Sequence, residues 1–139
     1  MSWDILIMSS DGTPEDLNTV PSGWLPNPIG EVSVVREQIN KAIDNVDWSV
    51  PAWGNYKHED LSIEINLQEE GEVESFALHI RGQGNPIPVI ARLCNQNGWV
   101  AIDYYDSRMI DFKGDALSRW KRFTDYRDDV LDELDKGST

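Results

Sequence analysis

The sequence predicts an α+β fold in which two helices pack on one face of an antiparallel sheet. Two consecutive segments in the middle of the chain alternate strictly between apolar and polar residues, which is the pattern of half-buried antiparallel strands. One helical segment precedes this pair and another follows it, and a short apolar run flanks each helix on its outer side. The order strand, helix, strand, strand, helix, strand is that of the ferredoxin-like split βαβ (βαββαβ) arrangement, followed here by one more helix.

The N-terminal part begins with a strand and a long irregular segment. The apolar run Trp3–Met8 suits a buried strand. Residues 9–30 are rich in proline and glycine, so we predict a loop there. Residues 31–46 form the first predicted helix, because their apolar residues recur every three or four positions. We predict a second loop over residues 47–60.

The central hairpin joins residues 61–67 to residues 73–81. Glu70-Gly71 offers a tight turn between them, since glycine readily adopts a positive φ. This turn places Ile63 opposite Leu78 and puts both apolar sets on the face that the helices cover.

The next predicted elements are a short helix and two strands. Asn85 caps a helix over residues 86–97, and Gly98 ends it. Residues 99–104 form the fourth strand and residues 109–112 a short fifth one.

The C-terminal part ends in one long predicted helix. Its segment, residues 116–135, has a stripe of apolar residues that Arg127 interrupts. A chain of 139 residues has the length of one domain. We therefore predict a single domain over residues 1–139, with a core in residues 1–112 and a helical extension in residues 113–139.

The charge is strongly negative and unevenly distributed. The net charge is −13, and residues 1–80 contain fifteen acidic and three basic residues. Nucleic acids and anionic membranes both require a cationic surface, so we expect neither as a partner. The first residues have no basic segment and only a short apolar run, which favours a cytoplasmic protein over a secreted one.

No motif indicates a cofactor or a metal. The single cysteine, Cys94, cannot by itself form an internal disulfide or a zinc site. Asp103, Asp106 and Asp111 follow the fourth strand, and we interpret them as turn residues.

Four segments carry a resemblance to known proteins: MSWD at the start, Pro28-Ile29-Gly30, Pro51-Ala52-Trp53-Gly54, and the hairpin SIEINL…SFALHIRG. In these segments the chain resembles a family of small, uncharacterised acidic bacterial proteins. The resemblance covers residues 1–112 and implies a bacterial origin, but it includes no catalytic motif. As a small acidic α/β protein, the chain is also similar to the immunity proteins that block toxins, although it shares no motif with them.

The leading functional hypothesis is a non-enzymatic interaction module, such as an immunity or antagonist protein, that occludes a basic protein partner such as a toxin. Carboxylates of such a protein speed association, and a few buried aromatic side chains provide affinity. The predicted partner-binding residues are the steering carboxylates and the aromatic anchors, namely Glu69, Glu70, Glu72, Glu74, Trp48, Trp53 and Tyr56.

Two alternatives belong to other functional classes. The predicted hairpin sets Ser62 opposite His79, with Glu64 on the same face, and these residue types are the kit for acyl transfer in a small hydrolase or another ligand-binding enzyme. The open face of the sheet could instead join copies of the chain in a homo-oligomeric structural module.

Overall fold

The computed structural model describes residues 1–137 and places them in two sheets, three α-helices and one 3₁₀ turn. The strands are β1 (Trp3–Ser9), β2 (Gly30–Glu31), β3 (Asp47–Val50), β4 (Trp53–His58), β5 (Leu61–Asn66), β6 (Glu72–Val73), β7 (Ser75–Gly82), β8 (Trp99–Asp103) and β9 (Arg108–Met109). The helices are η1 (Leu17–Thr19), α1 (Val32–Ala42), α2 (Ile87–Asn97) and α3 (Ala116–Gly137).

The larger sheet has seven strands in the order β3-β4-β5-β7-β1-β8-β9, and each neighbouring pair is antiparallel. The predicted α+β class is confirmed. The predicted four-stranded sheet is wrong in size, because β3 and β4 extend one edge and β9 extends the other. The short strands β2 and β6 pair separately from this sheet.

The hairpin β3–β4 lies within residues 47–60, which we predicted to be a loop. The apolar alternation of a strand is hidden there because Gly54 takes a buried position on β4. A Cβ at Gly54 would lie 2.9 Å from both the Trp48 ring and a methyl group of Val46. These two side chains therefore fill the space that an apolar residue of β4 would otherwise occupy.

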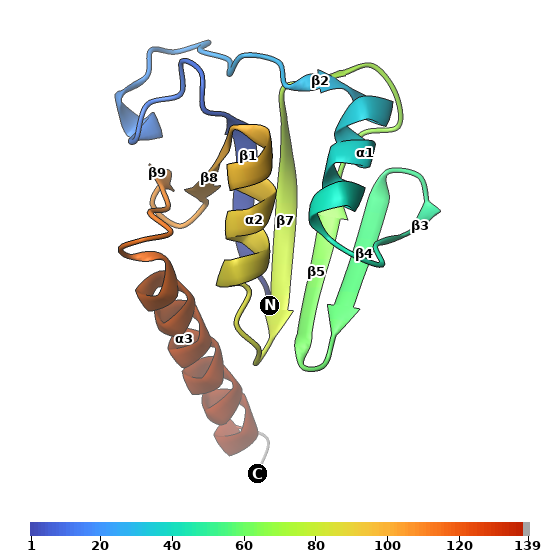
Figure 1. Ribbon diagram of the computed structural model, residues 1–139. Coiled ribbons are helices and arrows are strands. Elements are labelled where there is room, and N and C mark those ends of the chain that lie inside the picture. Colours follow the sequence, from blue (N-terminus) through green and yellow to red (C-terminus); the bar gives the residue numbers. More distant parts are fainter. Residues whose placement is uncertain (138–139) are drawn as a thin grey trace.

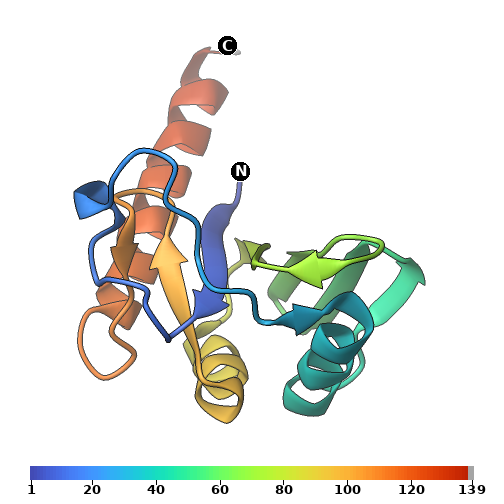
Figure 2. The same ribbon diagram turned by 90° about the horizontal axis from the view of Figure 1, so that it is seen from above.

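Helices α1 and α2 lie side by side on one face of the sheet (Figure 1), and the view from above shows both on the same side (Figure 2). Ile63 and Leu78 are both fully buried in the core beneath them, as predicted. The fully buried side chains of the sheet and of the two helices include Ile5, Ile7, Ile63, Ile65, Leu78, Ile80, Val35, Ile39, Ile90 and Leu93.

The register between β5 and β7 differs from the predicted one by two residues. Ile63 lies opposite Ile80, and Ile65 lies opposite Leu78. The predicted tight turn at Glu70-Gly71 does not join the two strands directly, because residues 72–73 leave the large sheet and pair with β2. A two-residue shift keeps every side chain on its predicted face, since successive side chains point to opposite faces of a strand.

Among the described residues of helix α3, the buried side chains lie between Ala116 and Arg127. Trp120 is buried, and its ring centroid lies 5.6 Å from that of Trp3. Arg127, which interrupts the apolar stripe, donates a hydrogen bond to the carbonyl of Gly82 at 2.6 Å. The C-terminal end of α3 projects away from the body (Figures 1 and 2). Within residues 1–137, no helix is apolar over a stretch long enough to cross a membrane.

Candidate functional site

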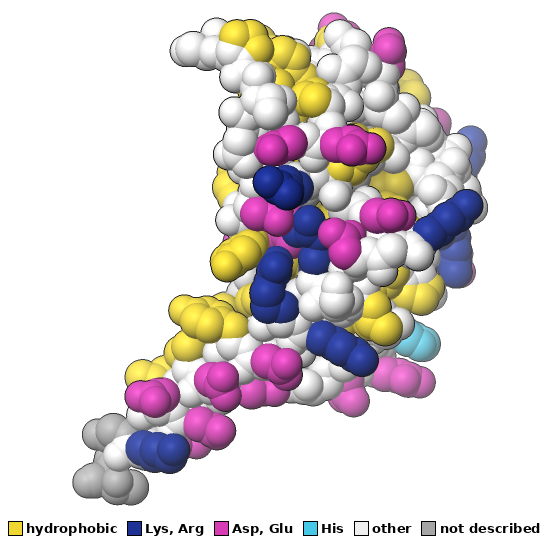
Figure 3. All heavy atoms as spheres, turned by 90° about the vertical axis from the view of Figure 1, so that its left-hand side faces the viewer, with side chains coloured by type: hydrophobic (Ala, Val, Ile, Leu, Met, Phe, Trp, Pro, Cys, Tyr) yellow, Lys and Arg dark blue, Asp and Glu magenta, His cyan; other side chains and the backbone are white. Residues whose placement is uncertain are grey.

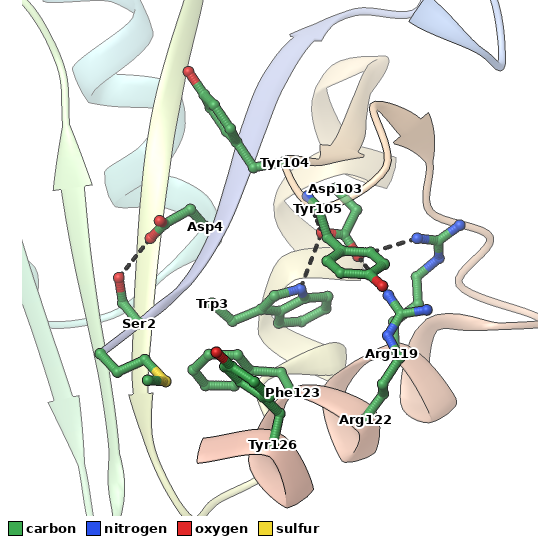
Figure 4. Close-up of a pocket in the computed structure, with 11 residues that line it drawn as sticks. Ser2, Trp3, Asp4, Asp103, Tyr104, Tyr105, Arg119, Arg122, Phe123 and Tyr126 are labelled. Carbon is green, nitrogen blue, oxygen red and sulfur yellow. Dashed lines mark hydrogen bonds and ion pairs between the residues drawn. The ribbon is translucent and has the colours of Figure 1, made fainter. Parts of the chain in front are cut away.

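A pocket of about 580 Å³ lies where the N-terminal strand, the turn after β8 and helix α3 meet. In Figure 4, Phe123 and Tyr126 extend from α3 toward Trp3, and Asp4 lies on the β1 side. The residues that line the pocket are Met1, Ser2, Trp3, Asp4, Asp103, Tyr104, Tyr105, Arg119, Arg122, Phe123 and Tyr126.

Three of the aromatic residues that line this pocket are exposed tyrosines. Tyr104, Tyr105 and Tyr126 are 61%, 75% and 61% accessible, respectively. Phe123, beside them, stacks on the buried ring of Trp120 with centroids 5.7 Å apart. Tyrosine rings gathered around a hollow are typical of protein-binding surfaces, where they provide contact area and a hydroxyl group.

Asp103, the last residue of β8, organises the floor of the pocket. Its side chain is fully buried. One of its oxygens accepts hydrogen bonds from the Trp3 indole at 3.3 Å and from the backbone N–H of Tyr105 at 3.0 Å. The other oxygen accepts a hydrogen bond from Arg119 at 3.0 Å. Asp103 thereby fixes the start of the turn that presents Tyr104 and Tyr105.

Arg119 joins this carboxylate to two others. Its Nη1 also lies 2.9 Å from Asp106, and its Nε donates to Asp115 at 2.7 Å. Burial alone would lower the pKa of Arg119, but the hydrogen bonds to Asp115 and Asp103 outweigh it and raise that pKa above its ordinary value. Arg119 therefore stays charged and ties α3 to the β8–β9 turn.

Arg122 forms the side wall of the pocket. Its guanidinium lies 4.3 Å from the centroid of the Tyr105 ring and 3.6 Å from Asp103. Together with Arg119 it contributes two positive charges to a cluster that contains the carboxylates of Asp103, Asp106 and Asp115. The mixture of both signs over the start of α3 is visible in Figure 3. These arginines are thus matched within the chain and do not make the pocket an anion site.

The predicted acyl-transfer group does not assemble. His79 lies opposite Glu64, as part of the β5–β7 pairing, whereas Ser62 lies opposite Arg81 and not opposite His79. The Nδ1 of His79 is 2.7 Å from Asp4. Within residues 1–137, no hydrogen bond joins Ser62 to His79, so the contact between nucleophile and base that acyl transfer needs is missing.

The three predicted aromatic anchors do not share one surface. Trp48 and Tyr56 pack against the hydrophobic core, and the Trp48 indole donates to Asn40 at 2.8 Å. Trp53 is exposed on the opposite face of the sheet, where its ring centroid lies 6.4 Å from that of His79. A single partner therefore does not reach all three from one side.

The four predicted steering carboxylates, Glu69, Glu70, Glu72 and Glu74, are all exposed. They lie in the connection between β5 and β7, at the beginning of β7. The pocket lined by Tyr104, Tyr105 and Tyr126, called the tyrosine pocket below, lies at the other end of the sheet. Helix α3, which forms one side of this pocket, contacts Gly82 at the end of β7. The sequence contains a cue for this pocket in the adjacent pair Tyr104-Tyr105 directly after a strand. Their meeting with Tyr126, however, depends on how α3 packs.

Comparisons of the chain with protein-family models, with curated proteins and with solved structures found no match. Among residues 1–137, no group of three or more histidine, cysteine, aspartate or glutamate side chains is arranged to hold a metal ion.

Proposed function

We propose that the chain is a non-enzymatic protein-binding module, an antagonist in the manner of immunity proteins, that binds a basic partner and blocks it by occlusion. The observation that carries this proposal is the set of three exposed tyrosines around one pocket of about 580 Å³. Tyrosine has few rotatable bonds, so a tyrosine cluster provides contact area at a low entropic cost. The pocket would receive an apolar or cationic side chain of the partner.

The buried ion pair between Asp103 and Arg119, called the frame below, supports this interpretation. Asp103 and Arg119 hold the β8–β9 turn and α3 together before any partner arrives. A preorganised surface binds more tightly because less conformational freedom is lost on association. The rigid frame thus suits a docking site that acts by shape and contact, without a chemical step.

The charge of the chain favours a basic partner. The net charge is −13, and the arginines of the pocket are already paired with carboxylates. Opposite net charges accelerate the encounter of two proteins and suppress binding to acidic competitors. An acidic chain with an aromatic docking site therefore fits an antagonist of a cationic protein.

We also propose a finer description of the fold. The strands β5, β7, β1 and β8 are consecutive neighbours in the sheet, and α1 and α2 stand between them along the chain. This order supports a ferredoxin-like split βαβ unit that β3, β4 and β9 extend at its two edges.

A comparative capture experiment tests the proposed function. Wild-type protein, a Tyr105→Ser/Tyr126→Ser variant and a Trp53→Ser control are immobilised and exposed to an extract of the native host. Trp53 is an exposed aromatic residue outside the pocket, so it controls for loss of any surface ring. We expect the same basic protein to be retained by wild type and control and lost by the pocket variant. Equal retention by all three, or loss with Trp53→Ser alone, would overturn the proposal.

A further inference from the structure

We propose that residues 128–135 of α3, called the α3 tip below, form a docking surface for a basic amphipathic helix. This inference rests on the proposed function, because the helix would belong to the same partner. The tip is the part of α3 that extends beyond Arg127, the last buried residue of the helix among those described (Figure 1).

The apolar stripe of α3 continues into the tip without a cover. Trp120, Phe123, Arg127, Val130 and Leu134 follow one another at intervals of three, four, three and four residues. This is the spacing of a helix face that packs on another helix. The first half of the stripe is packed, with Trp120 on Trp3 and Arg127 on the carbonyl of Gly82.

The second half of the stripe is open to solvent. Leu131 and Leu134 are 53% and 64% accessible, and Val130 is half-buried beside them. Figure 3 shows hydrophobic side chains along one edge of the projecting helix and acidic side chains beside them. Removing apolar surface from water is favourable, so a second helix gains free energy by covering this edge.

The charges of the tip favour a basic partner helix. Residues 128–135 contain five acidic residues and no basic one, and all five are exposed. Asp128 and Asp132 are spaced four residues apart, as are Asp129 and Glu133, and like charges at this spacing on a helix interact unfavourably. The basic residue of the last turn, Lys136, follows this segment. Cations from a partner would offset the unfavourable interaction while its apolar residues cover the leucines.

A second copy of the chain fits the tip poorly. Two such tips would bring five carboxylates against five others along the apolar edge, and like charges on neighbouring helices are destabilising. A helix with lysine or arginine on both sides of a leucine stripe is complementary in shape and in charge. The stripe offered to it is about 12 Å long, which is the length of eight helical residues.

The tip is continuous with the tyrosine pocket. Tyr126, Val130 and Leu134 are spaced four residues apart and so lie along one side of the helix. Tyr126 belongs to the pocket lining. A partner that inserts one side chain into the pocket can therefore lay a helix along the tip in the same complex.

The test uses the full chain and a synthetic peptide of about 21 residues, three leucine/lysine heptads long. A scrambled peptide of the same composition controls for charge. Protein variants are Leu131→Gln/Leu134→Gln in the tip and the matched control Leu25→Gln/Leu117→Gln, whose leucines are 66% and 43% accessible. Dissociation constants are measured by calorimetry, and circular dichroism verifies that each variant is folded.

We expect the heptad peptide to bind wild type and control equally, and to bind the tip variant at least about tenfold more weakly. We also expect the scrambled peptide to bind at least about tenfold more weakly than the heptad peptide. Equal affinity for the scrambled peptide, or for the tip variant, would overturn the inference, as would a wild-type dimer that Leu131→Gln/Leu134→Gln dissociates. If the heptad peptide does not bind the tip but the capture experiment succeeds, the docking surface on the α3 tip is refuted and the role of the pocket is not. If the peptide binds the tip but the capture experiment fails, the role of the pocket is refuted and the docking surface is not.

Discussion

Asp103 is the residue on which the candidate site depends most. We interpreted it from the sequence as a turn residue, and its bond to the backbone N–H of Tyr105 agrees with that. Its pairing with Arg119 could not be predicted, because the partner lies on a helix whose packing the sequence does not reveal. Removal of a buried carboxylate that is paired and hydrogen-bonded in this way destabilises the folded protein.

Removing the Asp103 carboxylate should therefore destabilise the whole fold. We expect Asp103→Ala to lower the free energy of unfolding by about 1–3 kcal/mol, because the buried Trp3 indole loses its acceptor and Arg119 keeps only its pairs with Asp106 and Asp115. Asp129→Ala, at an exposed position, should change it by less than about 0.5 kcal/mol. Urea unfolding of both variants is the measurement. Similar stabilities for the two would contradict this account of the frame.

Cys94 is expected to be unreactive in the native state. It is buried on α2, and burial raises the pKa of its thiol to about 12, so little thiolate exists near neutral pH. We expect a thiol reagent to label the native protein slowly and the urea-unfolded protein rapidly. The rate of labelling followed by absorbance is the measurement. Equally fast labelling of the two states would show that α2 does not cover this side chain.

Asp115 should make stability depend on pH in the acid range. Burial alone would raise its pKa, but the backbone N–H of Asp111 and the Arg119 guanidinium lower it below the ordinary value of 3.8. A carboxyl whose pKa is lowered by folding stabilises the protein above that ordinary value, and the contribution is lost as pH falls through the lowered pKa. We expect Asp115→Asn to unfold with a weaker pH dependence below 3.8 than wild type. Parallel curves for both proteins in a series of urea titrations would refute this.

Among the elements, the strands with a clear alternation were predicted correctly, and those without one were missed. The alternation of residues 61–67 and 73–81 placed Ile63 and Leu78 on the buried face. The strand β4 was missed because its buried position is Gly54, which has no side chain to mark it. The two-residue register shift was equally invisible, since it changes no side chain's face.

Helix α3 should divide into a stabilising half and a neutral half. We expect Trp120→Ala to lower the free energy of unfolding by about 3–5 kcal/mol, because a buried ring against Trp3 is lost. Leu134→Ala, in the projecting end, should change it by less than about 0.5 kcal/mol. Thermal or urea unfolding distinguishes the two. A large loss of stability from Leu134→Ala would mean that the tip is covered within the free protein.

For the whole molecule, the net charge could be counted from the sequence, whereas the location of the candidate site could not be predicted from it. The predicted anchors Trp48, Trp53 and Tyr56 are close together in the chain, but the sheet separates Trp53 from the other two. The pocket instead combines the N-terminal residues, the turn after β8 and α3. No local pattern indicates that these three segments meet.

The proposed electrostatic role of the four steering carboxylates remains a prediction. Reversing Glu69, Glu70, Glu72 and Glu74 to lysine should lower the association rate with the captured partner, most strongly at low salt. Exposed charges act on the encounter, and their effect is screened over a Debye length of about 8 Å at physiological salt. An association rate that is the same for this variant and wild type at low salt would exclude the role.

The most direct test of the central claim is the dissociation rate of that partner from wild type, Tyr105→Ser and Trp53→Ala at two salt concentrations. Loss of a tyrosine anchor of about 2 kcal/mol corresponds to a roughly 30-fold change in affinity, which is expressed mainly in dissociation. We predict that Tyr105→Ser raises the dissociation rate by about this factor at both salt concentrations, and that Trp53→Ala leaves it unchanged. A dissociation rate that rises with Trp53→Ala and not with Tyr105→Ser would place the partner on the open face of the sheet and contradict the claim.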